Sequence, residues 1–198
     1  MRFILASNNK GKLSEMSAIL SDFGIQVCSQ SQAGLSLEAE ETGTSFEENA
    51  IIKARAACNA LGEPSVADDS GLVVEALGGE PGVYSARYGG ESCNSDSQRM
   101  QLLLKNMQGQ ENRSACFVSC IACAFPNGDL ITAQGSCKGI IAALPKGQGG
   151  FGYDPVFYIP EKGKTMAELT AEEKNAISHR GEALKIFKEK LRKYYADK

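Results

Sequence analysis

The segment Phe3-Ile-Leu-Ala-Ser-Asn-Asn-Lys-Gly-Lys12 begins with four apolar residues and continues with six polar or small ones. The apolar part predicts a short buried strand, and the polar part predicts a loop that leads into a helix. The apolar residues of this helix recur at helical spacing as Leu13, Met16 and Leu20. Gly24 then ends the helix, and Ile25–Cys28 forms a second strand. A strand–helix–strand opening of this kind is typical of α/β proteins.

The rest of the chain mixes helix and strand patterns. The apolar runs Ser114–Phe125 and Leu130–Cys137 flank Pro126-Asn-Gly-Asp129, which is a hairpin signal. This hairpin either extends the first sheet or builds a smaller lobe. Further elements are predicted at the capping box Thr44-Ser-Phe-Glu47, after Asn94, at the strand Val156–Ile159, at the capping box Thr170-Ala-Glu-Glu173 and around Leu184, Phe187 and Leu191. We therefore predict an α/β fold with a mixed sheet, in which two lobes leave a cleft.

Length and composition are those of an ordinary soluble globular protein. The 198 residues suffice for one ample domain, or one domain with a small lobe, and 42% are apolar and 23% charged. The net charge of −3 gives no basic face for DNA or RNA, so we expect no nucleic-acid polymer as partner. Phe3–Ala6 is too short for a signal-peptide core and no later run could span a bilayer, so we expect no membrane partner.

The seven cysteines are odd in number and lie mostly within apolar stretches. Free thiols in a reducing compartment explain this better than disulfides, so we expect a cytoplasmic protein. Cys116, Cys120 and Cys123 invite a metal interpretation. Strand alternation, however, places the first two on one face and the third on the other, and we interpret all three as packing residues.

Two adjacent carboxylates, Asp68 and Asp69, carry the strongest chemical signal. Val66 and Ala67 before the pair and Gly71 after it predict that a strand ends here and delivers both acids to its carboxyl edge. Like charges repel, and burial of a carboxylate costs free energy unless a cation or donors compensate it. A hard cation such as Mg²⁺ takes oxygen ligands of this type. The alternative is a solvated turn, because Asp, Ser and Gly are ordinary turn residues.

The polar loop Ser7–Lys12 joins a buried strand to a helix start. Backbone amides and the helix dipole at such a junction favour an anion, so phosphate is the expected ligand, and Lys10 and Lys12 add positive charge. The spacing is not that of a Walker A loop, because no glycine stands five residues before Gly11. A polar turn with solvated lysines is the alternative.

Glu40, Glu41 and Lys53 would take part in chemistry only if the fold brings them beside Asp69. An acidic connector is often merely solvated, and Lys53 could be a rim lysine whose ammonium lies in water. Asn49, one helical turn before Lys53, makes that rim polar on a side that could equally face a cleft.

The segment Gly149-Gly-Phe-Gly-Tyr-Asp-Pro155 combines small residues with two aromatic rings and a carboxylate. Glycines permit close backbone approach, and Phe151 or Tyr153 offers a flat face on which a base could stack. The alternative is a glycine-rich loop whose aromatic side chains are packed into the core.

His179 is the only histidine, and Arg180 follows it. A lone histidine is usually structural. Together with Lys174 upstream, however, this pair could donate hydrogen bonds to keto oxygens or phosphates.

Six short motifs occur in a fixed order along the chain. They are Ser7-x-Asn9-x-x-Lys12, Glu40-Glu-Thr-Gly43, Glu48-Asn-Ala-x-x-Lys-Ala54, Ala67-Asp-Asp-Ser-Gly71, Phe151-Gly-Tyr-Asp154 and Ser178-His-Arg180. This set resembles the inosine triphosphate pyrophosphatase family, from the first strand to about residue 187. No motif is decisive alone, but six in the right order are highly specific.

The resemblance implies a single domain over residues 1–198 with a mixed, elongated central sheet flanked by helices, and two lobes with a nucleotide cleft between them. It also implies a homodimer. Members of this family use Mg²⁺ to hydrolyse ITP, dITP and XTP to the monophosphate and pyrophosphate, which keeps deaminated purines out of nucleic acid. The small-molecule partner is therefore expected to be a purine nucleoside triphosphate.

The resemblance also implies roles for single residues. Asp69 is expected to accept the proton of the attacking water and to bind the metal, and Glu40 is the expected second metal ligand, although Glu41 adjoins it. Asp68 and Lys53 complete the expected catalytic group, with Asp68 supporting the metal site. The residues expected to hold phosphates are Ser7, Asn8, Asn9, Lys10, Gly11, Lys12, Lys53 and Ser70, and those expected to enclose the base are Phe151, Gly152, Tyr153, Asp154, Lys174, His179 and Arg180.

One departure from the family pattern is Asn8, where glycine is frequent. Asparagine tolerates unusual backbone angles better than most residues, so we expect the loop to keep its shape.

Base selection is a hydrogen-bond problem. Hypoxanthine and xanthine present an oxygen at position 6, whereas adenine presents an amino group. Arg180 and Lys174 only donate, so adenine would leave buried donors unpaired, at a cost of roughly 1–3 kcal/mol each. Two rival functions remain open: a nucleotide-binding regulatory module without turnover, and a phosphatase that releases orthophosphate.

Overall fold

The structure is a computed structural model that describes residues 1–37 and 39–196. The chain divides into two compact units, each with a hydrophobic core of its own. Unit 1 comprises Met1–Asp69, Ser119–Gly135 and Arg180–Lys198, and unit 2 comprises Ser70–Val118 and Ser136–His179.

Helices and strands alternate at the start of the chain and strands follow one another in its middle, as the sequence predicts. The α-helices are α1 (Lys10–Leu20), α2 (Phe46–Leu61), α3 (Asp96–Asn106), α4 (Ala171–Ile177) and α5 (His179–Ala196). The strands are β1 (Arg2–Leu5), β2 (Gln26–Ser29), β3 (Ser65–Val74), β4 (Ser114–Ala124), β5 (Leu130–Ile141), β6 (Phe157–Ile159) and β7 (Lys164–Thr165). Short 3-10 helices cover Ser21–Phe23, Glu75–Leu77, Gly82–Arg87, Gly90–Ser92, Asp154–Val156, Pro160–Lys162 and Met166–Glu168. Among the described residues, no helix has the length and apolar character needed to cross a bilayer.

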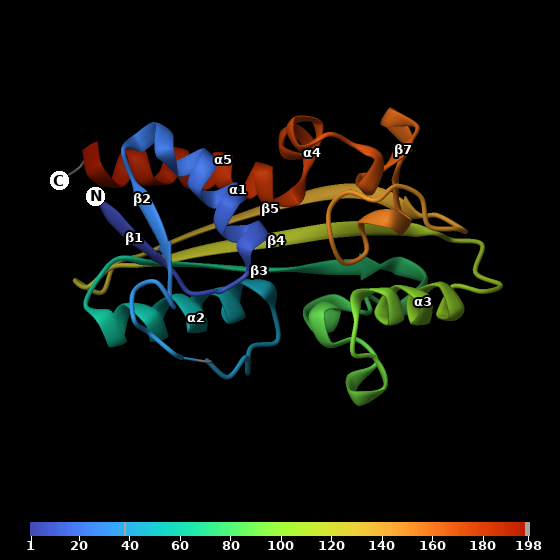
Figure 1. The fold of residues 1–198 in the computed structure, drawn as a ribbon, viewed down its shortest axis with the longest axis horizontal. Helices are drawn as coiled ribbons and strands as arrows, with labels where there is room; N and C mark the ends of the chain where they lie inside the picture. Colours follow the sequence, from blue (N-terminus) through green and yellow to red (C-terminus); the bar gives the residue numbers. More distant parts are fainter. Residues whose placement is uncertain (38, 197–198) are drawn as a thin grey trace. The chain divides into compact units, whose positions relative to one another are not determined.

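Within the described part of the chain, seven strands form one sheet in the order β2-β1-β3-β4-β5-β6-β7 (Figure 1). Strand β1 pairs in parallel with β2 and β3, whereas β6 pairs antiparallel with β5 and β7. Strands β3, β4 and β5 contribute residues to both units. The mixed sheet confirms the predicted α/β class, and the β4–β5 neighbours confirm the predicted hairpin, which extends the sheet.

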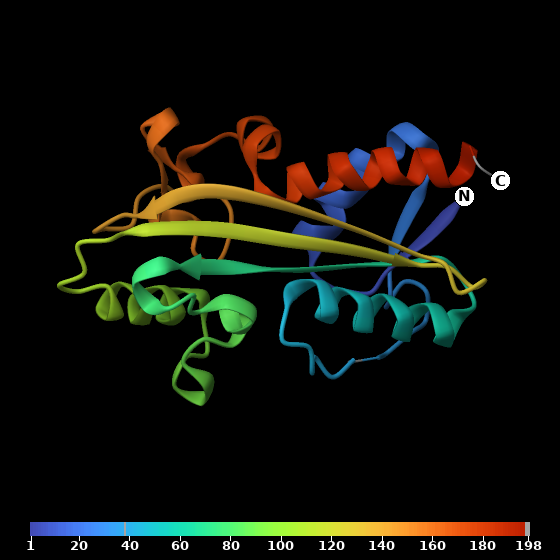
Figure 2. The ribbon, with the colours of Figure 1, turned by 180° about the vertical axis from the view of Figure 1, so that it is seen from behind.

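In unit 1, α1 and α5 cover one face of the sheet and α2 covers the other, as Figures 1 and 2 both show. Phe3 of β1 and Met16 of α1 are fully buried there. The apolar residues predicted for the last helix, Leu184, Phe187 and Leu191, are also fully buried. Their spacing places them on one stripe of α5, which therefore packs on the sheet.

In unit 2, α3 and α4 lie on opposite sides of the sheet (Figures 1 and 2). The core of this unit includes Leu103 of α3, Phe117 of β4 and Phe157 of β6. The two phenylalanine rings lie 4.3 Å apart between centroids. Each unit therefore holds its own part of the sheet in place by helix-on-sheet packing.

The prediction that a strand ends at the acidic pair is wrong. Strand β3 continues through Asp68 and Asp69 to Val74. Leu72 and Val74 are fully buried, so continuing the strand buries apolar side chains that a turn would expose. The acids therefore lie within a central strand, and the solvated-turn alternative is excluded.

In α2 and α3 the observed N-cap lies one residue after the predicted one, and the cause is the same in both helices. The N-cap of α2 is Ser45, which accepts a hydrogen bond from the Glu48 amide, while Glu48 in turn accepts one from the Thr44 amide. In α3 the N-cap is Ser95, one residue after the predicted Asn94. In both helices the predicted residue precedes the cap, and its amide is bound by the side chain of the third helical residue. The second predicted capping box, at the start of α4, is confirmed.

Candidate active site

The loop after β1 is shorter than predicted, because α1 already begins at Lys10. The side chain of Asn9 is the N-cap and accepts a hydrogen bond from the Lys12 amide at 3.1 Å. The Ser7 hydroxyl accepts one from the Asn9 amide, also at 3.1 Å. The first turn of α1 contains no acidic residue. Its outward-pointing amides therefore form the kind of helix start that binds anions.

Asn8, the departure from the family pattern, has an ordinary backbone conformation. No non-glycine residue in the described part of the chain has a positive φ. The Asn8 side chain instead accepts a hydrogen bond from the Ser31 amide at 3.3 Å. The asparagine thus ties the loop to the turn that follows β2, a contact that glycine could not make.

Asp68 is buried among positive charges. Its carboxylate lies 2.8 Å from the Lys12 ammonium and 3.2 Å from the Arg180 guanidinium, and it accepts a hydrogen bond from the Ser119 hydroxyl. Burial alone would raise the pKa of Asp68, but Arg180 and Lys12 outweigh it and hold the pKa well below its usual range. Asp68 is therefore ionised at any physiological pH.

Arg180 is 2% exposed and bridges two carboxylates of unit 1. Besides Asp68, it contacts Glu15 of α1 at 2.5 Å. Burial acts to lower the pKa of Arg180, but these two carboxylates raise it overall. This environment favours a structural role for the guanidinium, and a role in base recognition stays a prediction.

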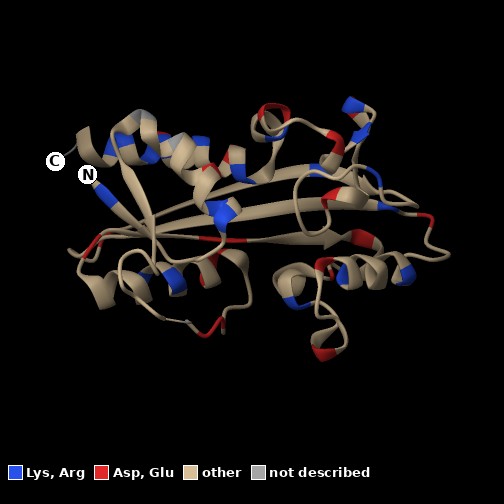
Figure 3. Cartoon of the chain, viewed as in Figure 1, with Lys and Arg blue, Asp and Glu red and all other residues tan. Residues whose placement is uncertain are grey.

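Asp69 lies in a different electrostatic setting. Its carboxylate contacts the Lys53 ammonium at 2.6 Å, and the same ammonium contacts Glu41 at 2.8 Å. Burial raises the pKa of Asp69, and the attraction of Lys53 offsets only part of this because Glu41 opposes it. Figure 3 shows a red stretch within β3, the strand that carries Asp68 and Asp69. Asp69 is therefore a carboxylate with a raised proton affinity.

Lys53 is not a solvated rim lysine, since its side chain is only 15% exposed. Its ammonium also donates to the Asp68 carbonyl at 3.3 Å. Burial acts to lower the pKa of Lys53, but Asp69 and Glu41 raise it overall. Lys53 therefore stays charged and links the acidic connector to β3.

The contacts of Lys53 indicate which acids are placed to bind a metal ion. Glu41, rather than the exposed Glu40, is the acid that shares a cation with Asp69. Within the described residues, no group of three His, Cys, Asp or Glu residues converges as a complete metal cage. Mg²⁺ usually takes only one or two carboxylates and fills its other positions with water and phosphate oxygens. Two carboxylates that converge on one positive charge fit that requirement. Glu40 as a ligand stays a prediction.

The glycine-rich segment of unit 2 is organised around Asp154. This carboxylate accepts a hydrogen bond from the Phe151 amide at 3.0 Å and contacts the Lys174 ammonium at 2.9 Å. A Cβ at Gly150 would come within 1.9 Å of it, and Gly150 has a φ of +73°, so only glycine fits there. The Lys174 ammonium lies 4.9 Å from the centre of the Phe151 ring, which is 43% exposed. Phe151 therefore offers a flat, exposed face next to a cation.

Tyr153 does not offer such a face. Its ring is 6% exposed within the core of unit 2, and its hydroxyl donates to the Ser85 carbonyl at 2.9 Å. Burial raises the pKa of Tyr153. The predicted alternative of a ring packed in the core holds for this residue. A contact of its backbone, or of Gly152, with substrate stays a prediction.

His179 is 6% exposed, and its ring stacks on Phe117 of unit 2 at 4.8 Å between centroids. Ser70 follows Asp69 in β3 and is half-buried. The roles predicted for His179 in base binding and for Ser70 in phosphate binding stay predictions.

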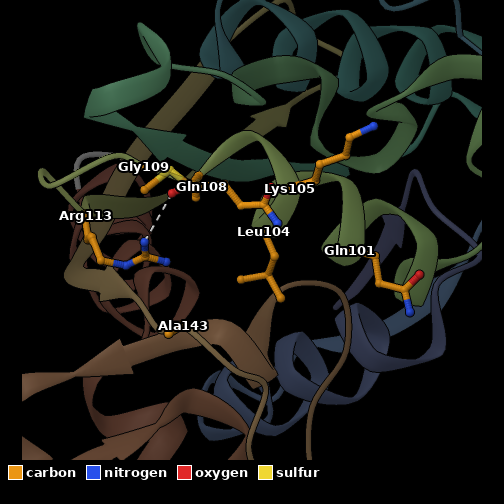
Figure 4. Close-up of a pocket in the computed structure, with 8 residues that line it drawn as sticks. Gln101, Leu104, Lys105, Gln108, Gly109, Arg113 and Ala143 are labelled. Atoms are coloured by element: carbon orange, nitrogen blue, oxygen red, sulfur yellow. Dashed lines mark hydrogen bonds between the residues drawn. The ribbon is translucent and has the colours of Figure 1, made fainter.

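Unit 2 also contains an open hollow of about 390 Å³ beside α3 (Figure 4). No residue of the predicted site lines it. Arg113 at its edge donates to the carbonyls of Met107, Ile141 and Ala142 and so joins segments of this unit. The lining residues are Gln101, Leu104, Lys105, Met107, Gln108, Gly109, Arg113 and Ala143.

Sequence reasoning missed Glu15 and Ser119. Glu15 is one turn after Lys12 in α1, a spacing that places both on one helix face. Ser119 stands among apolar residues of β4 and is fully buried. A buried hydroxyl needs a hydrogen-bond partner, so a lone serine in an apolar run indicates that a polar partner lies nearby.

All seven cysteines are free thiols.

These features define an α/β protein in which two buried acids of a central strand are paired with lysine and arginine side chains. One of these lysines, Lys12, lies in the first turn of a helix whose start is suited to anions. The chain belongs to the Ham1 family, whose model matches residues 3–190. A dITP/XTP pyrophosphatase of Desulforamulus reducens is 50% identical over 98% of each chain. One of Shigella flexneri is 47% identical over 96% of this chain and 98% of its own. The solved structure of a HAM1 protein from Coxiella burnetii superposes with a TM-score of 0.90 at 43% identity, covering 98% of this chain and 99% of that one. The resemblance inferred from the six motifs is thereby confirmed.

Proposed function

We propose that the protein hydrolyses deaminated purine nucleoside triphosphates (ITP, dITP and XTP) to the monophosphate and pyrophosphate. The relatives named dITP/XTP pyrophosphatase support this substrate class. The observation that carries the proposal is the buried Asp69, whose carboxylate shares the Lys53 ammonium with Glu41 and has a raised pKa. A buried carboxylate that stays ionised beside a lysine is suited to general-base catalysis.

Asp69 accepts the proton of the attacking water in this mechanism. Its raised pKa makes it a stronger base than a solvated aspartate, while Lys53 keeps it ionised. Asp69 and Glu41 would hold Mg²⁺, which supplies charge neutralisation on the phosphate oxygens when bound. Asp68 does not take part in proton transfer, because its pKa is too low for a base.

The triphosphate binds at the first turn of α1. The amides of this turn and the lysines Lys10 and Lys12 supply donors and positive charge. Lys12 is already held by the Asp68 carboxylate at 2.8 Å. Its ammonium is therefore oriented before substrate arrives, which lowers the ordering cost of binding.

For recognition of the base we propose Phe151 and Lys174, as the family resemblance implies. The exposed Phe151 ring provides the stacking face. Lys174, fixed by Asp154, donates to the oxygen at position 6 of hypoxanthine or xanthine. An adenine amino group cannot accept this hydrogen bond, so ATP is disfavoured.

The test is incubation with Mg²⁺ and ITP, XTP, dITP, GTP or ATP, with every product quantified. We expect monophosphate and pyrophosphate in equal amounts from the first three and much slower turnover of ATP. Orthophosphate as the first product would favour the phosphatase alternative. Stoichiometric ITP binding without product would favour the regulatory module.

We also propose that the protein is a cytoplasmic homodimer and that its two units form one domain over residues 1–198. The free cysteines support a reducing compartment. The single family model over residues 3–190 supports one domain. The homodimer is supported by the family resemblance, and light scattering of the purified chain tests it.

A further inference from the structure

Asn49 of α2 is fully buried, yet it binds a loop rather than its own helix. Its side-chain oxygen accepts a hydrogen bond from the Gly43 amide at 2.9 Å. Its side-chain nitrogen has no hydrogen-bond partner among the described residues. Burial of a half-satisfied amide is unfavourable, so the position is explained by what the oxygen holds rather than by stability.

Gly43 fits this contact through its lack of a side chain. A Cβ there would lie 2.7 Å from the Asn49 oxygen and 2.7 Å from the Glu48 Cβ. The next amide, of Thr44, donates to the Glu48 carboxylate at 2.7 Å. Two successive loop amides are therefore fastened to side chains in the first turn of α2. We call the pairing of Gly43 with Asn49 the connector clamp.

Gly43 of the connector clamp lies two residues after Glu41, and Asn49 lies one helical turn before Lys53. Glu41 contacts the Lys53 ammonium, which also contacts Asp69. A single helix thus carries both the anchor of the acidic connector and the cation that meets its carboxylate. Releasing the anchor would free Glu41 to leave that position.

We propose that Asn49 is a positioning residue that sets the divalent-cation affinity of the site by holding Glu41 opposite Asp69. This inference rests on the proposed function, since it assigns Glu41 and Asp69 to the cation. In this proposal Asn49 acts only through Glu41, by way of its hydrogen bond with the Gly43 amide. Removing such supporting partners typically costs 10–100-fold in metal affinity or activity.

The test uses Asn49→Ala and Gly43→Ala, which open the connector clamp from its two sides. Gly43 does not have a positive φ, so alanine is strained there only by the contact with Asn49 and Glu48. Asn59→Ala is the matched control, because Asn59 is an exposed asparagine of the same helix. Glu41→Gln defines the effect of losing the carboxylate itself.

Three readouts are measured: Mn²⁺ binding by electron paramagnetic resonance without substrate, amide hydrogen exchange of residues 39–45, and the Mg²⁺ concentration for half-maximal ITP hydrolysis. We expect both clamp variants to weaken Mn²⁺ binding and raise the Mg²⁺ requirement about 10-fold or more, and to accelerate exchange of the connector amides. Asn59→Ala should match wild type. Asn49→Ala combined with Glu41→Gln should lose no more affinity than Glu41→Gln alone.

Wild-type cation affinity in both clamp variants would overturn the inference, as would a lowered melting temperature with unchanged exchange and affinity. If Asn49→Ala does not fold, Gly43→Ala decides. The outcomes separate from those of the proposed function. A wild-type protein whose Mn²⁺ affinity depends on the connector clamp, but which does not hydrolyse ITP, would refute the function alone.

Discussion

The two faces of β3 in unit 1 give adjacent aspartates opposite properties. Asp68 meets Lys12, Arg180 and the Ser119 hydroxyl, and its pKa is lowered. The Asp69 carboxylate contacts a single ammonium, that of Lys53, which Glu41 also contacts, and the pKa of Asp69 is raised. Successive residues of a strand point to opposite faces, so a one-residue step exchanges one environment for the other.

The comparison shows that burial alone does not decide the state of a carboxylate. Both aspartates are less than 9% exposed. What differs is the balance of nearby charges: an excess of cations fixes Asp68 as an ion, whereas near balance leaves Asp69 able to take up a proton. Asp68 therefore fits a structural role, and Asp69 fits the general base that we propose.

The largest expected effect is that of Asp69→Asn. Removing a general base lowers turnover by about 10²–10⁴-fold, and loss of a metal ligand adds to this, so we expect at least about 10³-fold lower kcat for ITP. Nucleotide binding, measured by calorimetry, should largely remain. Near-normal turnover would remove Asp69 from the mechanism.

Asp68→Asn should act on stability. It leaves Arg180 with one buried carboxylate fewer, and breaking such a pair costs about 3–5 kcal/mol in the free energy of unfolding. The folded pKa of Asp68 is below its unfolded value, so its contribution is present above about pH 4 and is lost as pH falls further. Urea unfolding between pH 7 and pH 3 measures both effects. A loss below about 1 kcal/mol at pH 7 would contradict a structural role.

Lys53→Met should shift the pH dependence of kcat/KM for ITP. Lys53 lowers the pKa of Asp69, so its removal raises that pKa, and the ionised base is then lost at higher pH. We expect the acid limb of kcat/KM for ITP at saturating Mg²⁺ to shift upward by about 1–3 pH units. Arg55→Met, an exposed charge change on the same helix, is the control. An acid limb that stays in place would mean that another group sets it.

The smallest effect is expected for Ser119→Ala. Asp68 keeps Lys12 and Arg180, so only one hydrogen bond to a charged group is lost, at about 1.5–3 kcal/mol in the free energy of unfolding. Thermal unfolding beside wild type measures it. A loss comparable to that of Asp68→Asn would show that the hydroxyl, rather than the cations, holds the carboxylate.

Local patterns were enough to predict most elements of the fold. Apolar spacing located α1, α5 and the β4–β5 hairpin, and one of two capping boxes was placed correctly. The continuation of β3 was missed because Asp, Ser and Gly favour turns locally, and burial of Leu72 and Val74 overrides that preference.

The candidate site was only partly predictable. Asp69 and Lys53 were named from motifs, and the structure joins them at 2.6 Å. The partners of Arg180 were not foreseeable, since Asp68 and Glu15 lie 112 and 165 positions away in the chain. Long-range ion pairs depend on tertiary packing and leave no local trace. The choice of Glu41 over Glu40 likewise depends on how the connector is fastened to α2.

The Lys53 ammonium between Asp69 and Glu41 acts as an internal counter-ion. Because it neutralises the acids from within, the fold does not rely on a divalent ion to suppress their repulsion. Chelation should therefore stop turnover while the melting curve stays where it is. On the proposed function, the protein then stays folded when its divalent ion is withdrawn and resumes turnover when the ion returns.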